Sequence, residues 1–252
     1  QSYKVLNVDI RPTVINSKAR LTYQEVQDII EGKNKHAFKA QINDLRKLSI
    51  ALYKDRSKNG SLDFNIPEPV FDMNEKGIPD DIRPSERLIS HRIVEECMLL
   101  ANKVVAVEIP KKIPKNLNFF YRVHIKPDSL RVEKFAGLLK RLKLGIYAPD
   151  GEMSPNDFKK ILKHVEDSPY RPLIENVALR TMSKAEYAIK NKGHFGLAFK
   201  NYTHFTSPIR RYPDLLVHRM IKMLDRHSFE LKNEWNDKIE EALKLSNEKE
   251  IE

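Results

Sequence analysis

The sequence contains a single cysteine, Cys97, so no disulfide can form within its 252 residues. It has only 8 glycines and no low-complexity tract, which argues against a disordered chain. It lacks any run of about 18 apolar residues, so we expect no transmembrane helix. Its first residues lack the apolar segment and cleavage pattern of a signal peptide. These absences favour a cytoplasmic globular protein in which Cys97 is a buried, inert thiol.

Acidic residues are in the minority. The chain carries 45 Lys and Arg against 35 Asp and Glu, for a formal net charge of +10. A positive excess of this size suits a polyanionic partner, such as nucleic acid. Charge alone does not separate RNA from DNA, an anionic lipid surface or an acidic protein.

Recognisable metal ligands are also missing. The eight histidines have no zinc spacing, and Cys97 has no cysteine partner. Asp72, Asp80 and Asp81 flank an expected hairpin turn, where solvent-exposed carboxylates are common. The sequence therefore predicts no metal site within this chain.

Hydrophobic spacing predicts one α+β domain without an internal repeat. Thr22 and Glu25 form a capping box at a helix start, and Ser154 with Pro155 marks another. Further helices are expected at 36–58, 85–108 (ended by Pro110), 129–142, 155–166, 173–190, from the loop at 201–219 to about 225, and from 233 onward. Strands are expected at 3–15, 61–64, 70–73, 78–82, 118–125 and 194–199.

The most informative segment is 201–219, a loop that leads into a helix. Thr206 and Ser207 can cap that helix, and Pro208 suits its first turn. Arg210 and Arg211 then add two guanidiniums beside free backbone N–H groups, which already favour an anion. These residues predict a phosphate site. The alternative is a solvated helix face with an ordinary i,i+3 ion pair between Arg211 and Asp214.

The same segment resembles a known family. Residues 204–219 (HFTSPIRRYPDLLVHR) are similar to the signature of the ribonuclease II / ribonuclease R exoribonucleases, and the similarity extends to 90–102, 121–127, 180–187 and 193–199. The likeness is strongest to the ribonuclease R branch. It implies an α+β RNB-type catalytic domain with a mixed sheet surrounded by helices and a narrow channel for the single-stranded 3′ end of RNA. The implied reaction is processive 3′→5′ hydrolysis to nucleoside 5′-monophosphates, with Mg²⁺ as cofactor.

The resemblance also assigns individual residues. It places the catalytic arginine at Arg210, where a guanidinium would stabilise the transition state. It places a carboxylate that contacts the terminal ribose at Glu95 and a base-stacking aromatic ring at Phe64. The remaining positions assigned to RNA contact are Tyr23, Thr206, Ser207 and Arg211.

Structural roles are open alternatives at several of these positions. Phe64 is equally compatible with a place in the hydrophobic core. Of Glu95 and Glu96, one could face solvent while the other pairs with Arg92.

The resemblance further implies that residues 1–252 are a partial catalytic domain. The family's metal-binding aspartates lie N-terminal to the matching part, and an RNA-binding β-barrel follows it. We therefore expect the 252-residue chain to be inactive alone. The alternative function is a non-catalytic RNA-binding module. We expect no membrane partner and no disulfide-linked partner.

Overall fold

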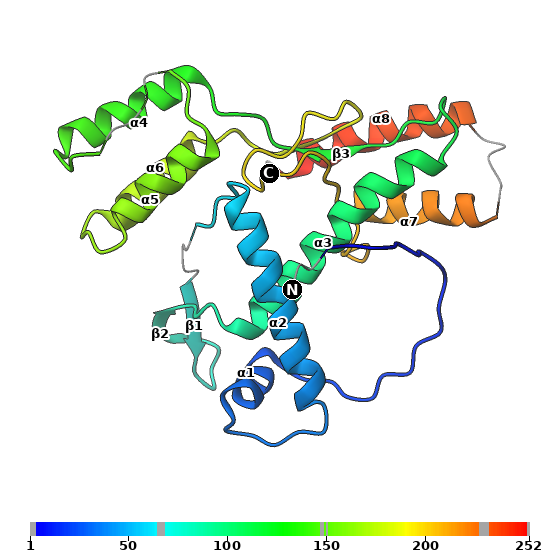
Figure 1. Ribbon diagram of the computed structural model, residues 1–252, viewed down its shortest axis with the longest axis horizontal. Helices are drawn as coiled ribbons and strands as arrows, with labels where there is room; N and C mark the ends of the chain where they lie inside the picture. Colours follow the sequence, from blue (N-terminus) through cyan, green and yellow to red (C-terminus); the bar gives the residue numbers. More distant parts are fainter. Residues whose placement is uncertain (1–3, 65–68, 147–148, 150, 227–231, 251–252) are drawn as a thin grey trace.

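A computed structural model describes residues 4–64, 69–146, 149, 151–226 and 232–250 (Figure 1). The described helices are α1 (Tyr23–Glu31), α2 (Lys39–Lys58), α3 (Ile89–Lys112), α4 (Ser129–Arg141), α5 (Pro155–His164), α6 (Arg171–Thr181), α7 (Tyr212–Asp225) and α8 (Lys232–Lys249). The described strands are β1 (Pro69–Met73), β2 (Pro79–Pro84), β3 (Tyr121–Val123) and β4 (Glu186–Ala188). No described helix is long and apolar enough to cross a membrane.

Helix α3 is the central rod of the molecule, and α2 crosses it in the middle of Figure 1. Its buried face includes Ile93, Val105 and Ile109. Its first N–H groups are capped from another helix, because the Gln27 side chain on α1 accepts hydrogen bonds from Ile89 and Ser90 at 3.0 and 3.4 Å. Helix α3 therefore ties the N-terminal helices to the rest of the fold.

The described residues form two hydrophobic clusters, and the end of α3 belongs to the second. Helices α4, α5 and α6 form the lobe on the left of Figure 1, around the fully buried Phe135, Phe158 and Ile174. The end of α3 packs with β3, α7 and α8 around residues that include Phe120 and Met220. Burying a side chain of this kind stabilises the fold by roughly 1.5–3 kcal/mol. Both clusters therefore hold their helices in place.

The α+β class is confirmed, with small sheets. β1 and β2 form an exposed antiparallel hairpin, whose turn places the Gly77 N–H on the Asn74 carbonyl at 2.9 Å. β3 pairs antiparallel with β4, and a parallel bridge between His124 and His194 extends that pairing. The mixed pairing thus centres on the segment that precedes residues 201–211, which we call the signature loop.

Most expected elements are present, including the capping boxes at Thr22 and Ser154. The strand expected at 3–15 is wrong: residues 4–22 are irregular and mostly exposed, because no other described strand lies beside them to complete a ladder. Residues 61–64 are also irregular, and residues 194–199 form a turn between two bridge residues instead of the expected strand. The helix expected at 173–190 ends at Thr181, and β4 follows.

Helix α3 starts and ends later than expected. It begins at Ile89, where Gln27 supplies the cap that the local sequence lacks. It continues through Pro110 to Lys112. A proline in the last turn removes only its own N–H bond, and the next turn still closes through the Ile113 N–H on the Ile109 carbonyl at 3.2 Å.

Cys97 is half-buried on α3, less enclosed than expected. Burial raises the pKa of its thiol, and the Glu96 charge adds to the effect. A raised pKa disfavours the reactive thiolate, which agrees with an inert role.

Candidate active site

The signature loop is bound to α3 through hydrogen bonds. Asn102, which is 2% exposed, accepts a hydrogen bond from the Phe205 N–H at 3.0 Å and donates one to the Tyr202 hydroxyl at 3.1 Å. From the other side, His218 on α7 stacks on Phe205 with ring centroids 4.3 Å apart. The loop is therefore held at two points before it reaches its arginines.

The expected helix start at Thr206 and Ser207 is wrong. α7 begins at Tyr212, with Arg211 as its N-cap and Pro213 in its first turn. Had the helix started at Ser207, Pro213 would lie in its second turn and remove an intrahelical bond. Residues 208–210 instead form a turn, in which the Arg210 and Arg211 N–H groups donate to the Ser207 carbonyl at 3.3 and 3.1 Å.

A carboxylate already occupies the start of α7. Asp214 is fully buried and accepts the Ser207 N–H at 2.8 Å. It also accepts two hydrogen bonds from the Arg211 guanidinium, at 2.9 and 2.8 Å. A negative side chain at this position satisfies the helix dipole, so the argument for phosphate binding rests on the arginine side chains.

The two arginines differ in availability. Arg211 is engaged by Asp214 and its side chain is 18% exposed. Arg210 is exposed, and its guanidinium has no ion-pair or hydrogen-bond partner within the described ranges. Arg210 is therefore the more accessible of the two guanidiniums, and the assignment of Arg210 to catalysis and of Arg211 to RNA contact stays a prediction.

The loop itself contains a neutral imidazole, that of His204. Burial, together with the nearby Arg211 and Arg122 charges, lowers the pKa of His204 to about 3. Its Nδ1 lies 2.7 Å from the Tyr187 hydroxyl, whose pKa burial raises to about 12. His204 is thus uncharged at neutral pH and supports the loop without adding positive charge.

The Thr206 hydroxyl is buried and has no hydrogen-bond partner among the described residues. Ser207 contributes its backbone N–H and carbonyl to the loop, as above. The assignment of both residues to RNA contact stays a prediction.

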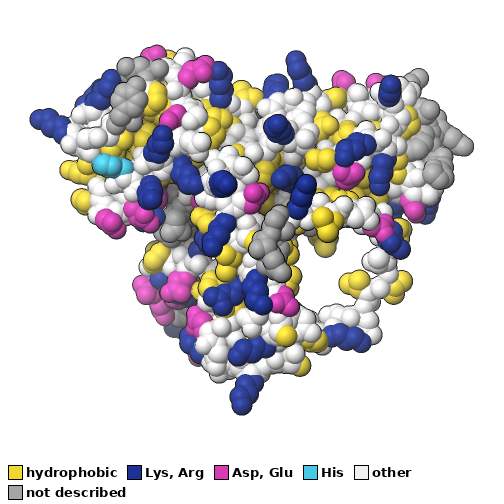
Figure 2. Space-filling model, viewed as in Figure 1, with side chains coloured by type: hydrophobic (Ala, Val, Ile, Leu, Met, Phe, Trp, Pro, Cys, Tyr) yellow, Lys and Arg dark blue, Asp and Glu magenta, His cyan; other side chains and the backbone are white. Residues whose placement is uncertain are grey.

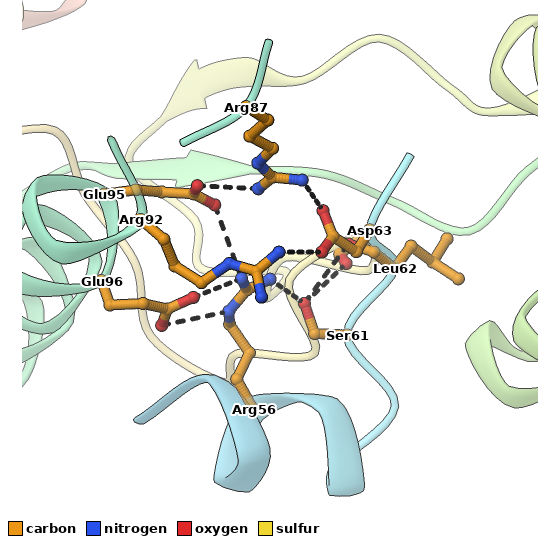
Figure 3. Close-up of polar contacts among 9 residues, drawn as sticks. Arg56, Ser61, Leu62, Asp63, Arg87, Arg92, Glu95 and Glu96 are labelled. Carbon is orange, nitrogen blue, oxygen red and sulfur yellow. Dashed lines mark hydrogen bonds and ion pairs between the residues drawn. The ribbon is translucent and has the colours of Figure 1, made fainter. Parts of the chain in front are cut away.

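Three arginines and three carboxylates cluster around the N-terminal half of α3 (Figure 3). Arg56 is 5% and Glu96 is 2% exposed, and the two form hydrogen bonds of 2.5 and 3.4 Å. Arg56 also donates to the Ser61 hydroxyl at 2.6 Å and lies 3.5 Å from Glu95. Arg56 therefore fixes α3 against both α2 and the segment that leads to Phe64.

Arg87 bridges the other two carboxylates in this cluster, as Figure 3 shows. It donates to Asp63 at 2.5 Å and to Glu95 at 2.7 Å. Arg92 lies 3.8 Å from Asp63 and over the Tyr53 ring at 4.2 Å. The alternative that Glu95 or Glu96 pairs with Arg92 is wrong, because Arg87 and Arg56 take those carboxylates.

Among the residues assigned by sequence, Glu95 belongs to this cluster, and Phe64 and Tyr23 adjoin it. Glu95 remains 34% exposed. Phe64 follows the anchored Asp63 and packs partly buried against the α4–α6 cluster. Tyr23 is 47% exposed and its ring lies 4.1 Å from that of His91, one turn before Glu95. The assignment of all three residues to RNA contact stays a prediction.

One helix face links this cluster to the signature loop. Glu95 and Asn102 are seven residues apart on α3, which is two helical turns, or roughly 10 Å. Seven-residue spacing also puts both on one face of the helix. The signature loop, which carries Arg210, is therefore bound to the same face of α3 that carries Glu95.

No group of three His, Cys, Asp or Glu side chains in the described part of the chain could hold a metal ion. Asp72 pairs with Arg83, and Asp80 accepts a hydrogen bond from Asn74, both on the exposed hairpin. Figure 2 shows Lys and Arg spread over the visible face with acidic side chains between them, so charge alone does not outline a site.

Comparisons with known proteins agree on one family. A family model described as RNB domain matches residues 1–227. Ribonuclease R of Ureaplasma parvum is 38% identical over 232 residues, covering 87% of this chain and 32% of the relative. Ribonuclease R of Aquifex aeolicus is 40% identical over 219 residues, covering 85% and 30%. The chain therefore spans about a third of the length of these relatives.

A solved structure shows the same fold. Mycoplasma genitalium RNase R, in complex with ribose methylated single-stranded RNA, matches with a TM-score of 0.81 at 24% identity. The match covers 91% of this chain and 36% of that chain.

Proposed function

Since the chain belongs to the RNB-domain family, we propose that it forms part of the catalytic domain of a ribonuclease R-like 3′→5′ exoribonuclease. The observation that carries this proposal is the position of Arg210: exposed, unpaired among the described residues, and on a loop anchored to the helix face that carries Glu95. The substrate would be the single-stranded 3′ end of RNA. The products would be nucleoside 5′-monophosphates.

In this proposal, water attacks the phosphorus between the last two nucleotides, and the bond to the 3′ oxygen of the penultimate nucleotide breaks. Negative charge grows on the phosphoryl oxygens during this step. The Arg210 guanidinium would stabilise that charge with its planar set of N–H donors. Mg²⁺ assists such a reaction when it is held by clustered carboxylates. Because the described residues contain no such cluster, we assign no step at the metal to this chain.

Glu95 and Phe64 would hold the terminal nucleotide. A carboxylate has about four lone-pair positions, and among the described residues the Glu95 carboxylate contacts Arg87 and the more distant Arg56. It can still accept from a ribose 2′-hydroxyl, a group that DNA lacks. Phe64 would stack on a base, and Tyr23 would add a further contact at the exposed end of α1.

We propose that the 252 residues bind RNA but do not degrade it alone. The test uses the purified chain with 5′-labelled single-stranded RNA and Mg²⁺. We expect RNA binding that weakens steeply with salt and no shortening of the RNA. Degradation by the chain would contradict its inactivity, and absence of salt-dependent binding would contradict the function.

The role of Arg210 is tested in any active protein that contains this chain. Arg210→Ala should lower turnover by on the order of 10²–10³, as expected for the loss of a transition-state donor, and leave RNA affinity mostly intact. Arg226→Ala, at the exposed C-terminal end of α7, is the matched control and should keep full turnover. If no such longer protein hydrolyses RNA, the chain is instead a non-catalytic RNA-binding module.

A further inference from the structure

The part of the signature loop that precedes Arg210 is buried among aromatic and polar groups. Tyr202 is 5% exposed, and its ring meets the His194 and His204 rings edge-on, with centroids 5.2 and 5.7 Å apart. The Arg122 N–H donates to the Tyr202 carbonyl at 2.9 Å. This end of the loop is therefore held against β3.

Phe205, five residues before Arg210, is held at both of its backbone polar groups. Its N–H donates to Oδ1 of Asn102 on α3 at 3.0 Å. Its carbonyl lies 3.0 Å from Nε2 of His218 on α7, and the His218 ring stacks on the Phe205 ring. A helix on each side therefore fixes this residue.

The Asn102 amide can face only one way. Because the Phe205 N–H can only donate, the Asn102 Oδ1 must face it. Nδ2 then faces the Tyr202 hydroxyl and donates to it at 3.1 Å. Burial raises the pKa of Tyr202, so this hydroxyl stays neutral at physiological pH. Asn102 is 2% exposed, so solvent does not compete for either bond.

Asn102 links two parts of the candidate site. Among the described residues, it is the only α3 side chain that hydrogen-bonds to the signature loop. The same helix carries Glu95 on the same face, roughly 10 Å away. The two other side-chain anchors nearest Arg210 are His218 and Asp214, and both belong to α7, into which the loop continues. Of these three anchors, only Asn102 therefore fixes the loop relative to Glu95.

We infer that Asn102 is a positioning residue for the hydrolytic reaction. Its bond to the Phe205 N–H holds the loop so that Arg210 and Glu95 engage the same RNA end at a fixed separation. Asn102 is buried, so it acts through the loop and does not touch RNA. The inference rests on the proposed function, in which Arg210 stabilises phosphoryl charge and Glu95 contacts the ribose. A displacement of roughly 1 Å can cost on the order of 10² in rate, so the loss of one buried bond has a measurable effect.

The test measures kcat and KM on single-stranded RNA in an active protein that contains this chain. Asn102→Leu leaves the Phe205 N–H without an acceptor. It should lower kcat by about tenfold to 100-fold, while KM stays within about threefold of the parent value.

Ile109→Ala is the matched control, because Ile109 is also 2% exposed, lies seven residues further along α3 and has no hydrogen-bonding side chain. It should lower the melting temperature at least as much as Asn102→Leu does, but keep kcat. Equal losses of kcat in the two variants, or a loss confined to KM, would overturn the inference.

Two further variants separate the two bonds of Asn102. Asn102→Asp keeps an acceptor for the Phe205 N–H and offers a second oxygen to the Tyr202 hydroxyl, so it should recover most of the turnover that Asn102→Leu loses. Tyr202→Phe removes only the partner of Nδ2 and should lower kcat less than Asn102→Leu does. Thermal unfolding checks that each variant folds, and Tyr202→Phe decides if Asn102→Asp does not. A folded Asn102→Asp as slow as Asn102→Leu, or an equally slow Tyr202→Phe, would contradict a positioning role for the Phe205 bond.

Amide hydrogen exchange in the 252-residue chain tests the hold on the loop independently of activity. Asn102→Leu should speed exchange at residues 205–211, relative to α7, by about tenfold or more. Ile109→Ala should not. Unchanged exchange would overturn the inference even if Arg210 is catalytic. Faster exchange with unchanged turnover would also overturn it and leave the proposed function standing. If exchange becomes faster but no protein that contains the chain hydrolyses RNA, the proposed function fails, and Asn102 still sets the place of the loop beside Glu95.

Discussion

The buried ion pair between Arg56 and Glu96 provides the sharpest test of the architecture around α3. Glu96→Gln preserves shape but leaves the Arg56 guanidinium, 5% exposed, without its closest counter-charge. Breaking one partner of a buried pair costs about 3–5 kcal/mol. We expect the lower end, about 3 kcal/mol, because Glu95 remains 3.5 Å from Arg56. For a chain of this size such a loss lowers the melting temperature by about 6–12 °C.

Urea unfolding followed by circular dichroism measures this loss. The matched control is Glu234→Gln, which removes an i,i+4 ion pair of 2.9 Å between side chains that are 60% and 68% exposed. It should cost less than about 0.5 kcal/mol. Replacing both buried partners, Arg56→Met with Glu96→Leu, should destabilise less than Glu96→Gln alone, since no charge is left buried. If Glu96→Gln and the control lose the same free energy, the pair does not hold α3 in place.

Three further predictions follow. The pKa values of His194 and His204 are about 3 in the folded state and about 6.5 when unfolded. Between these pKa values the unfolded chain binds more protons than the folded chain. The free energy of unfolding should therefore fall as pH drops from about 6 to 4, by roughly 2–3 kcal/mol per pH unit for the two histidines together. Midpoints of urea unfolding that do not change with pH would contradict this. Asp214→Asn should lower the free energy of unfolding in urea by about 3 kcal/mol and weaken RNA binding, because it removes the fully buried carboxylate that holds the loop. Unchanged RNA affinity would mean that RNA binding does not depend on this carboxylate. Arg87→Gln should weaken RNA binding several-fold, because Arg87 links Asp63 to Glu95. The control Arg83→Gln breaks an exposed ion pair on the hairpin and should leave RNA binding unchanged. Equal effects of the two variants in a binding titration would show that Arg87 is not part of the site.

Local signals in the sequence predicted local structure well. The capping boxes at Thr22 and Ser154 mark two helix starts correctly because each is complete within four residues. The turn at Asn74–Gly77 is likewise local, since the Asn74 side chain bonds the N–H groups of residues 76 and 78. The α+β class follows from these elements and from the family resemblance.

Long-range partners were beyond sequence reasoning. Arg56 and Glu96 are 40 residues apart, and neither position has a local pattern that marks it as buried. The cap on α3 comes from Gln27, 62 residues before Ile89. The strand expected at 3–15 had the right alternation but no neighbouring strand among the described residues. In each case the missing information was the identity of a distant neighbour.

The signature loop shows how the structure separates two residues that the sequence treats alike. Arg210 and Arg211 are adjacent, and both could bind phosphate. Asp214 distinguishes the two arginines, because its carboxylate oxygens accept hydrogen bonds from the Arg211 guanidinium and the Ser207 N–H. That same carboxylate makes the helix start a poor anion site, and Arg210 is the guanidinium there without a partner among the described residues. The alternative of an ordinary i,i+3 ion pair is thus correct for Arg211, and the assignment of Arg210 as the catalytic arginine stays a prediction.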